Sequence, residues 1–361
     1  MSAQLLRAAI IGTGRIGSTY DDEVVAREAP AFYTGPMRHS GLYTILPVNH
    51  ADAYQTTPGY ALVAAANRGE EKLRAFGERR QLRALYGDFR QLLSQERPDV
   101  VSVCTRSPEK AEVVIAAAEA GVRAIIVEKA LATSMAEADA MLAACERHGV
   151  ALVVNHPYRF SPMARKAKAL IAEGAIGEPG TVSAFASGGM MHVGTHTFDL
   201  LRYLAGDVVS VDARVPNYVP EHDLPATGTL RFASGATGFF DHVHRVQAGY
   251  EVRGTRGRVS FSSLVGDGWL EQTSPLHPEA TRPYPTRVTM TPIEGDAHDR
   301  SPTQRMLAEL HDSLTNGAPF ISTGRDGAAA LELGLACYAS HLAGGPVALP
   351  LADRSLRVPN R

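Results

Sequence analysis

The chain has 361 residues, 45% of them hydrophobic, and this is enough apolar material for two domains because single cores rarely grow past about 250–300 residues. Its 36 Lys and Arg residues are balanced by 38 Asp and Glu residues, so we expect no basic surface for nucleic acid. The three cysteines are too few and too far apart for a disulfide framework or a cysteine-based zinc site. No signal-peptide pattern and no apolar run of about 18 residues is present, so we expect a cytoplasmic protein without a membrane span.

The first predicted element is an apolar strand at residues 8–11, which leads directly into a Gly-x-Gly-x-x-Gly turn. Gly12 permits the tight turn, Gly14 lets the backbone approach a pyrophosphate, and Gly17 lets the next helix pack closely on the strand. The N-terminus of that helix offers N–H groups and a favourable dipole to phosphate. The pattern predicts a dinucleotide-binding turn made of Gly12, Gly14, Arg15, Ile16 and Gly17.

The rest of the first third alternates strands and helices, as a doubly wound parallel sheet requires. Continuous apolar runs, typical of strands covered on both faces, lie at residues 60–66, 99–104, 124–128 and 151–154. Helices are predicted up to residue 76 and at residues 109–120 and 135–148. We therefore predict a Rossmann domain over residues 1–130, whose sheet is completed by the helix and strand of residues 135–155.

A long irregular stretch interrupts the first strand–helix–strand unit at about residues 20–50. Asn67, at the end of the second strand, follows Gly17 by many more residues than the ~20 that usually separate the glycines from the ribose-binding acid. The insertion leaves from the cofactor side of the sheet. It is either a surface loop or a lid over the active site.

After about residue 160 the pattern changes to a helix at residues 161–173 and then mostly strands. The strands are predicted at residues 181–187, 208–214, 226–233, 236–243, 249–253, 257–263, 268–273 and 286–291. Two helices follow, at residues 303–315 and 326–343. We predict an α+β domain over residues 131–345 with a large, mainly antiparallel open sheet, and a C-terminal tail over residues 346–361.

Four segments together resemble the glucose–fructose oxidoreductase, inositol dehydrogenase and rhizopine-catabolism (Gfo/Idh/MocA) oxidoreductases. They are residues 10–17 (IIGTGRIG), 127–130 (VEKA), 194–201 (GTHTFDLL), and 326–333 (DGAAALEL) followed by 345–347 (GPV). The resemblance implies hydride transfer between the nicotinamide of NAD or NADP and a hydroxyl-bearing carbon of a sugar, sugar derivative or cyclitol. It also implies a homodimer or homotetramer formed through the C-terminal sheet.

Alcohol oxidation needs a base for the hydroxyl proton and a positive group for the developing alkoxide. Lys129 follows a strand at the carboxyl edge of the sheet, where ligands bind, so its ammonium can hold the reacting oxygen. His196 is a suitable proton acceptor because an ordinary imidazole titrates near neutrality. Asp199, three residues further along a helix, could orient His196 or simply favour the helix start. Glu128 and Lys129 are also expected to contact the cofactor.

The chain departs from the family pattern at two positions. Ala130 replaces the proline that usually follows the lysine, and His192 replaces an aspartate four residues before His196. His192 could itself be the acid or base, could only shape the pocket, or could mark an impaired oxidation. With His156 nearby, a zinc site is conceivable, but no Glu follows His192 as in His-Glu-x-x-His, so we expect no metal.

The cofactor preference depends on Asn67 and Arg68, because no carboxylate is present to bind the ribose hydroxyls and repel a 2′-phosphate. The guanidinium of Arg68 suits a phosphate, which favours NADP slightly over NAD, although it could also stack on adenine. Thr105, Arg106 and Pro108 follow the next strand and are further expected cofactor contacts.

The substrate pocket is expected between the two domains. Hydrogen-bonding and aromatic side chains suit a polyol there, and the candidates are His156, Tyr158, Arg159, His192 and Asp199. Two other functions remain open: an enzyme that cleaves glycosides through transient oxidation at C3 with a tightly bound cofactor, and a non-catalytic NAD(P)-binding regulator.

Overall fold

The computed structural model describes residues 5–27, 46–220, 222–244, 248–261, 268–276, 286–293 and 300–358. Its first layer is a six-stranded sheet in the order β3-β2-β1-β4-β5-β6, with every pairing parallel. The strands are β1 Leu6–Ile11, β2 Tyr60–Ala66, β3 Ala84–Tyr86, β4 Val100–Val103, β5 Ala124–Val127 and β6 Ala151–Val154. The predicted Rossmann-type sheet is confirmed.

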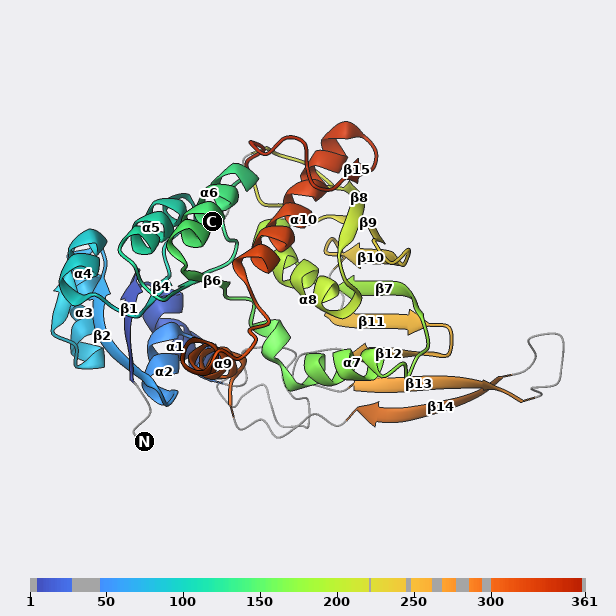
Figure 1. Ribbon diagram of the computed structural model, residues 1–361. Coiled ribbons are helices and arrows are strands. Elements are labelled where there is room, and N and C mark those ends of the chain that lie inside the picture. The colour runs from blue at the N-terminus through green and yellow to red at the C-terminus, as the bar shows by residue number, and fades with distance from the viewer. Residues whose placement is uncertain are drawn as a thin grey trace.

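Helices cover both faces of this sheet (Figure 1). They are η1 Arg15–Thr19, α1 Tyr20–Arg27, α2 His50–Thr56, α3 Glu70–Arg80, α4 Phe89–Glu96, α5 Ser107–Glu119 and α6 Met135–His148. Local sequence fixes their ends, as α6 illustrates. The Ser134 side chain caps its first turn by accepting the Glu137 N–H, and Gly149 ends it in the left-handed conformation (φ 66°).

The second layer is a nine-stranded sheet in the order β14-β13-β12-β11-β7-β10-β9-β8-β15. Among its described pairings, β7 and β10 run parallel and the others antiparallel, which confirms the predicted mainly antiparallel sheet. The strands are β7 Pro179–Phe185, β8 Val208–Arg214, β9 Thr227–Phe232, β10 Thr237–Asp241, β11 Gly249–Gly254, β12 Gly257–Phe261, β13 Gly268–Pro275, β14 Thr286–Ile293 and β15 Val347–Ala348.

The remaining helical segments join the two sheets. They are η4 Pro157–Phe160, α7 Pro162–Ala172, η5 Met190–Gly194, α8 Thr195–Ala205, α9 Pro302–Asn316 and α10 Gly324–Ala343. Helix α10 lies between the sheets and contacts α6 and β6 on one side and β8 and α8 on the other (Figure 1). One apolar cluster therefore runs from the first sheet through α10 to the second. Helix α9 returns to pack on α2, so the C-terminal part of the chain also covers the first sheet.

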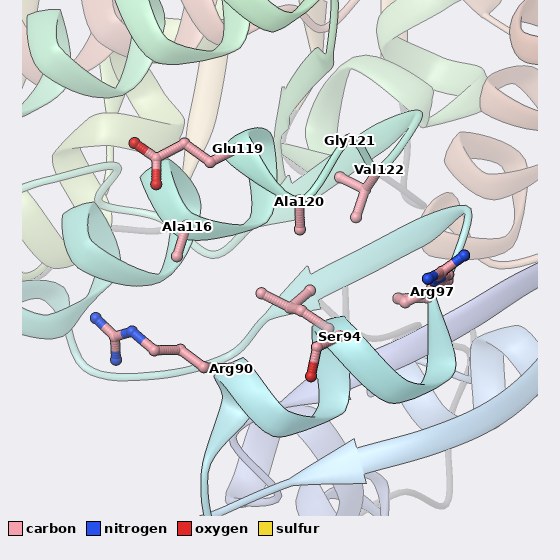
Figure 2. Close-up of a pocket in the computed structure, with 10 residues that line it drawn as sticks. Arg90, Ser94, Arg97, Ala116, Glu119, Ala120, Gly121 and Val122 are labelled. Atoms are coloured by element: carbon pink, nitrogen blue, oxygen red, sulfur yellow. The ribbon is translucent and has the colours of Figure 1, made fainter.

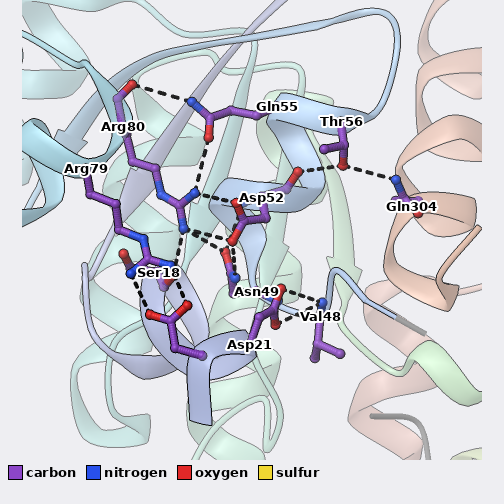
Figure 3. Close-up of polar contacts among 11 residues, drawn as sticks. Ser18, Asp21, Val48, Asn49, Asp52, Gln55, Thr56, Arg79, Arg80 and Gln304 are labelled. Atoms are coloured by element: carbon purple, nitrogen blue, oxygen red, sulfur yellow. Dashed lines mark hydrogen bonds and ion pairs between the residues drawn. The ribbon is translucent and has the colours of Figure 1, made fainter. Parts of the chain in front are cut away.

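The structure describes the two flanks of the predicted insertion. Asp21, at the start of α1, accepts the backbone N–H groups of Val48 (3.1 Å) and Asn49 (3.0 Å), and this ties the flanks together (Figure 3). The buried guanidinium of Arg80 reinforces the junction by donating to the Ser18 carbonyl (2.7 Å) and the Asp52 carboxylate (2.9 Å). Residues 28–45 lie outside the described residues, so the predicted lid stays a prediction.

Several short elements were not predicted: α2, β3, α4 and β15. Strand β3 has only three residues and β15 only two, so neither is long enough to show a hydrophobic period in the sequence. Helix α2 was hidden because it falls at the end of the irregular stretch that we interpreted as an insertion. In the described part of the chain, no helix combines the length and apolarity needed to cross a membrane.

Candidate active site

The glycine turn has the geometry that a dinucleotide requires. Gly12 has φ +100°, and a Cβ there would lie 2.8 Å from the Cys104 carbonyl carbon. A Cβ on Gly17 would lie 2.3 Å from the Gly12 oxygen, so this glycine allows the turn and the following helix to meet. A Cβ on Gly14, by contrast, would have no atom within 4 Å. The turn is therefore tightly packed on its protein side and open on the side where a pyrophosphate would approach.

A cavity of about 860 Å³ adjoins this turn, at the carboxyl ends of β1, β2 and β4. Its lining includes these predicted cofactor-binding residues: Gly12, Gly14, Asn67, Arg68, Thr105 and Arg106. Three other predicted cofactor-binding residues lie outside this lining: Arg15, Ile16 and Pro108. Pro108 is at the start of α5. The lining carries more carboxylates than cations, namely Glu70, Glu71, Asp88, Glu109 and Glu112 against Arg68, Lys72, Arg90 and Arg106.

Asn67 and Arg68, on which the cofactor preference depends, are both engaged. The Asn67 side chain accepts the Thr13 N–H (3.3 Å) and donates to the Gly69 carbonyl (3.0 Å). The Arg68 guanidinium forms an ion pair with Glu109. That pair is exposed, 77% at the Arg68 side chain, so it contributes little to the stability of the fold.

A second hollow, of about 720 Å³, lies between α4 and α5 (Figure 2). Arg90, Ser94 and Arg97 lie on one side of it, and Ala116 and Glu119 on the other. It also contacts Pro98 and Val122, which precede β4 and β5, so it lies at the amino ends of the strands. Ligands of open α/β sheets bind at the opposite, carboxyl ends, and this hollow is not the candidate site.

Lys129 follows β5 at the carboxyl edge, as predicted, and another lysine fixes its backbone. The fully buried Lys110 of α5 donates to the carbonyls of Glu128 (2.5 Å) and Ala130 (2.6 Å), the two residues that flank Lys129. Burial lowers the pKa of Lys110 to about 7. These two hydrogen bonds fix the backbone on both sides of Lys129, where Ala130 stands in place of the family's proline.

The described contacts of the Glu128 carboxylate are with His50 and Asn155. The carboxylate is 2.9 Å from His50 Nε2 and accepts the Asn155 amide (2.6 Å). Burial alone would raise its pKa, but the hydrogen bond and charge of His50 lower it to about 2. Burial alone would lower the pKa of His50, but Cys104 and Glu128 outweigh it and raise that pKa to about 10. His50 belongs to α2, so its contact with Glu128 connects the helix at the end of the predicted insertion to the residue next to Lys129.

His192 contacts Lys129 directly. The Lys129 amine donates to the His192 carbonyl (2.8 Å) and lies 3.2 Å from His192 Nδ1. Burial lowers the pKa of Lys129, and the Lys129 charge, followed by burial, lowers the pKa of His192. The histidine that replaces the family's aspartate therefore faces the proposed catalytic amine.

His196 contacts His156 instead of His192. Their Nδ1 atoms are 3.3 Å apart, and the His196 ring stacks on Tyr158 with ring centroids 4.7 Å apart. Burial, followed by the charge of Lys129, lowers the pKa of His196 well below its ordinary value. Burial also lowers the pKa of His156, so both rings are neutral at neutral pH.

Asp199 and Arg159, both expected at the substrate, form a buried ion pair. Arg159 Nε is 2.8 Å from Asp199 Oδ2, and its guanidinium also donates to the Ile321 carbonyl (2.8 Å) and pairs with Asp326 (3.2 Å). The Asp199 side chain is fully buried. The described contacts of Asp199 are therefore with Arg159 and not with His196. Through Arg159 of η4, these paired charges join α8 to α10.

Sequence reasoning missed several residues around Lys129: Lys110, His50 and Asp223. Lys110 and His50 belong to helices whose other residues show no special pattern. Asp223 lies between β8 and β9 in a loop without a motif. No local signal marks these three, because each acts through a partner distant in sequence. Among the described residues, no group of three or more metal-ligating side chains is arranged to hold a metal ion.

Comparison with known proteins agrees with this geometry. Residues 41–156 match the oxidoreductase family with an NAD-binding Rossmann fold, and residues 168–349 match the C-terminal alpha/beta domain of the same family. The first match begins after the glycine turn, within the predicted insertion.

The relatives include sugar and cyclitol dehydrogenases. A D-apiose dehydrogenase of Paraburkholderia graminis is 34% identical over 213 residues, which is 54% of this chain and 56% of that enzyme. The myo-inositol 2-dehydrogenase of Thermotoga maritima is 27% identical over 326 residues, 81% of this chain and 92% of that enzyme. The fold is that of an Agrobacterium radiobacter oxidoreductase solved with NAD⁺, L-tartaric acid and magnesium (TM-score 0.73, 21% identity, 95% of this chain and 98% of that one). The chain belongs to the Gfo/Idh/MocA family of oxidoreductases.

Proposed function

We propose that this protein transfers a hydride between a nicotinamide dinucleotide and a hydroxyl-bearing carbon of a sugar, sugar derivative or cyclitol. One observation carries the proposal: the amine of Lys129 and the rings of His192, His196 and His156 gather at the carboxyl edge of the sheet. The glycine turn opens at the same edge, where Gly14 faces free space. When bound there, the dinucleotide supplies the hydride acceptor or donor.

Two of these side chains have complementary tasks. Lys129 is held through its flanking carbonyls and by His192, and its ammonium can donate to the reacting oxygen and stabilise an alkoxide. His196 is neutral, so a ring nitrogen is free to accept the hydroxyl proton, and the negative charge that develops on the substrate oxygen offsets the Lys129 charge that otherwise lowers the pKa of this ring. His156 bonds the Nδ1 side of His196 and fixes the orientation of that ring.

The cofactor is an NAD(P) dinucleotide, and we propose that NAD is preferred. The sequence favoured NADP slightly because of Arg68, but Glu109 compensates the charge of that guanidinium. The excess of carboxylates around the cavity also opposes a 2′-phosphate. Both features support a bare ribose at this end of the site.

The substrate class follows from the polar side chains beside Lys129. His192, His156 and Tyr158 offer hydrogen-bonding groups next to an aromatic ring, which suits the hydroxyl groups and ring face of a polyol. The apiose and myo-inositol dehydrogenases among the relatives support the same class.

The test begins with calorimetric titration of NAD and NADP into the purified protein. A panel of aldoses, anhydrosugars and inositols is then incubated with the preferred cofactor, and NAD(P)H absorbance is followed. Cofactor-dependent oxidation of at least one polyol is expected. Cofactor binding without any turnover would contradict the proposal, and product formation without net NAD(P)H would identify a transient oxidation instead.

We further propose that the open face of the second sheet joins copies of this chain. Large apolar side chains on its strands are exposed: Phe185 (40%), Phe239 (47%), Trp269 (40%) and Met290 (54%). Such a patch is typical of an interface. Light scattering after gel filtration should show a dimer or tetramer that Phe239→Glu dissociates, and an unchanged mass for that variant would argue against this face.

A further inference from the structure

A carboxylate outside the predicted site is built into the turn that carries His192. Asp223, in the loop before β9, accepts two successive backbone N–H groups of η5. Its Oδ1 accepts the Met191 N–H (2.8 Å) and its Oδ2 accepts the His192 N–H (2.8 Å). Gly189 makes room for it, because a Cβ there would lie 2.2 Å from Asp223 Oδ2. The loop and the turn are therefore fitted to each other around this side chain.

The carboxylate is also fixed from the other side. The hydroxyl of Tyr338, on the bridging helix α10, lies 2.8 Å from Asp223 Oδ1 and accepts the Leu224 N–H (2.8 Å). Tyr338 is almost completely buried. The Asp223 carboxylate thus accepts three hydrogen bonds, which fix its position. It links α10 to the turn beside Lys129.

The same turn connects Asp223 to Lys129 through a single residue. The N–H of His192 points to Asp223, and the carbonyl of His192 accepts the Lys129 amine (2.8 Å). Burial lowers the pKa of Lys129, whereas the negative charges of Glu128 and Asp223 act in the opposite direction. The Glu128 carboxylate is hydrogen-bonded to His50 and Asn155. Asp223 is the carboxylate that is tied to the turn itself.

We propose that Asp223 is a positioning residue, which places the His192 carbonyl on the Lys129 amine and adds a negative charge near this amine to that of Glu128. This inference rests on the proposed function, in which the Lys129 ammonium binds the reacting oxygen. An imidazole at position 192 gives no negative charge, because its ring is either neutral or cationic. Besides Asp223, the titratable or charged groups around Lys129 and His192 are Glu128, Lys110, His156, His196 and Arg15.

The experiment measures the pKa of Lys129 directly. Lysines are reductively methylated with isotopically labelled methyl groups, the Lys129 signal is assigned with Lys129→Arg, and its chemical shift is followed against pH by NMR. In Asp223→Asn the titration midpoint should fall by about 0.5–1 pH unit. The exposed carboxylate of Asp212, which pairs with Arg214, provides the control, and Asp212→Asn should leave the midpoint unchanged.

A second variant distinguishes loss of the Asp223 charge from a general disturbance of the fold. Because His192 Nδ1 lies 3.2 Å from the Lys129 amine, a carboxylate at position 192 would stand beside that amine. The double variant D223N/H192D should therefore recover most of the lost pKa shift. In the same variants, the alkaline limb of the kcat/KM profile should move to lower pH with Asp223→Asn and return in the double variant.

If Asp223→Asn does not fold, Tyr338→Phe provides the second measurement, because it leaves the carboxylate and removes one of its three donors. A smaller fall of the Lys129 midpoint is expected there. An unchanged midpoint in every folded variant would overturn the inference. Absence of turnover in the parent would instead defeat the proposed function, while the NMR titration would still report on Asp223.

Discussion

The two halves of the candidate site are built in opposite ways. The half around the glycine turn uses short segments that each follow a strand, and its charges, such as Arg68 and Glu109, pair on an exposed surface. The half around Lys129 uses groups from distant parts of the chain: the buried Lys110 from α5, the buried His50 from α2 and the half-buried Asp223 from the loop before β9. Exposed pairs are worth little and can be exchanged, whereas buried ones are costly to break. Changes in the second half should therefore have larger effects.

The largest effect is expected from the groups that would touch the substrate. Lys129→Ala and His196→Ala should each reduce turnover by roughly 10²–10⁴-fold, because each removes a positioned electrostatic or acid–base group. Cofactor affinity should persist, since neither residue lines the cavity beside the glycine turn. Steady-state kinetics on a substrate of the parent and calorimetric titration of the cofactor measure the two quantities. Near-parental rates in both variants would refute the assignment.

The next largest effect should come from the lysine that holds Lys129. Lys110→Met keeps the side chain's length but leaves the carbonyls of Glu128 and Ala130 without their donor. We expect the free energy of unfolding to fall by roughly 1–3 kcal/mol, the cost of unsatisfied buried acceptors, and kcat to fall with it. Urea unfolding and kinetics test both. Lys166→Met, at an exposed lysine of α7, is the matched control and should change neither.

The same contrast explains what could be predicted from the sequence. The glycine turn, the parallel strands and Lys129 were predictable because motif and period are local properties. His196 was predicted as well, and His156 was expected nearby, but Asp199 was expected to orient His196; the contact of His156 with His196 joins the end of β6 to α8, which no local pattern indicates. The burial of Arg159 and Asp199 could not be predicted from the sequence either. A charged residue in a sequence gives no sign of whether its partner is a substrate or another side chain.

A smaller, selective effect is expected in the exposed half. Glu109→Gln removes the carboxylate that compensates Arg68, so affinity for NADP should rise relative to NAD by up to about fivefold, because an exposed ion pair is worth about 1 kcal/mol at most. Titration of both cofactors measures this ratio. Glu112→Gln, which breaks the similar pair with Arg90 (2.7 Å), should have less effect. In Arg68→Ala, an equal loss of affinity for NAD and NADP would indicate adenine stacking instead of phosphate binding.

The last prediction concerns the pH dependence of the buried pair of His50 and Glu128. The pKa of His50 is raised from 6.5 to about 10, so its contribution to stability is complete below pH 6.5 and is lost as pH rises through 10. The pKa of Glu128 is lowered from 4.5 to about 2, so its contribution is complete above pH 4.5 and is lost as pH falls through 2. The pair therefore stabilises the fold most between pH 4.5 and 6.5.

His50→Gln should lower the free energy of unfolding most within that window. The difference from the parent should shrink above pH 6.5 by at most about 1.4 kcal/mol per pH unit, because the folded parent then holds a proton that the unfolded chain has lost. Urea unfolding of both proteins at successive pH values gives the difference. His148→Gln, at an exposed histidine ending α6, controls for the loss of an imidazole. A difference that stays constant with pH would show that the buried half is held by packing alone and not by the charges of His50 and Glu128.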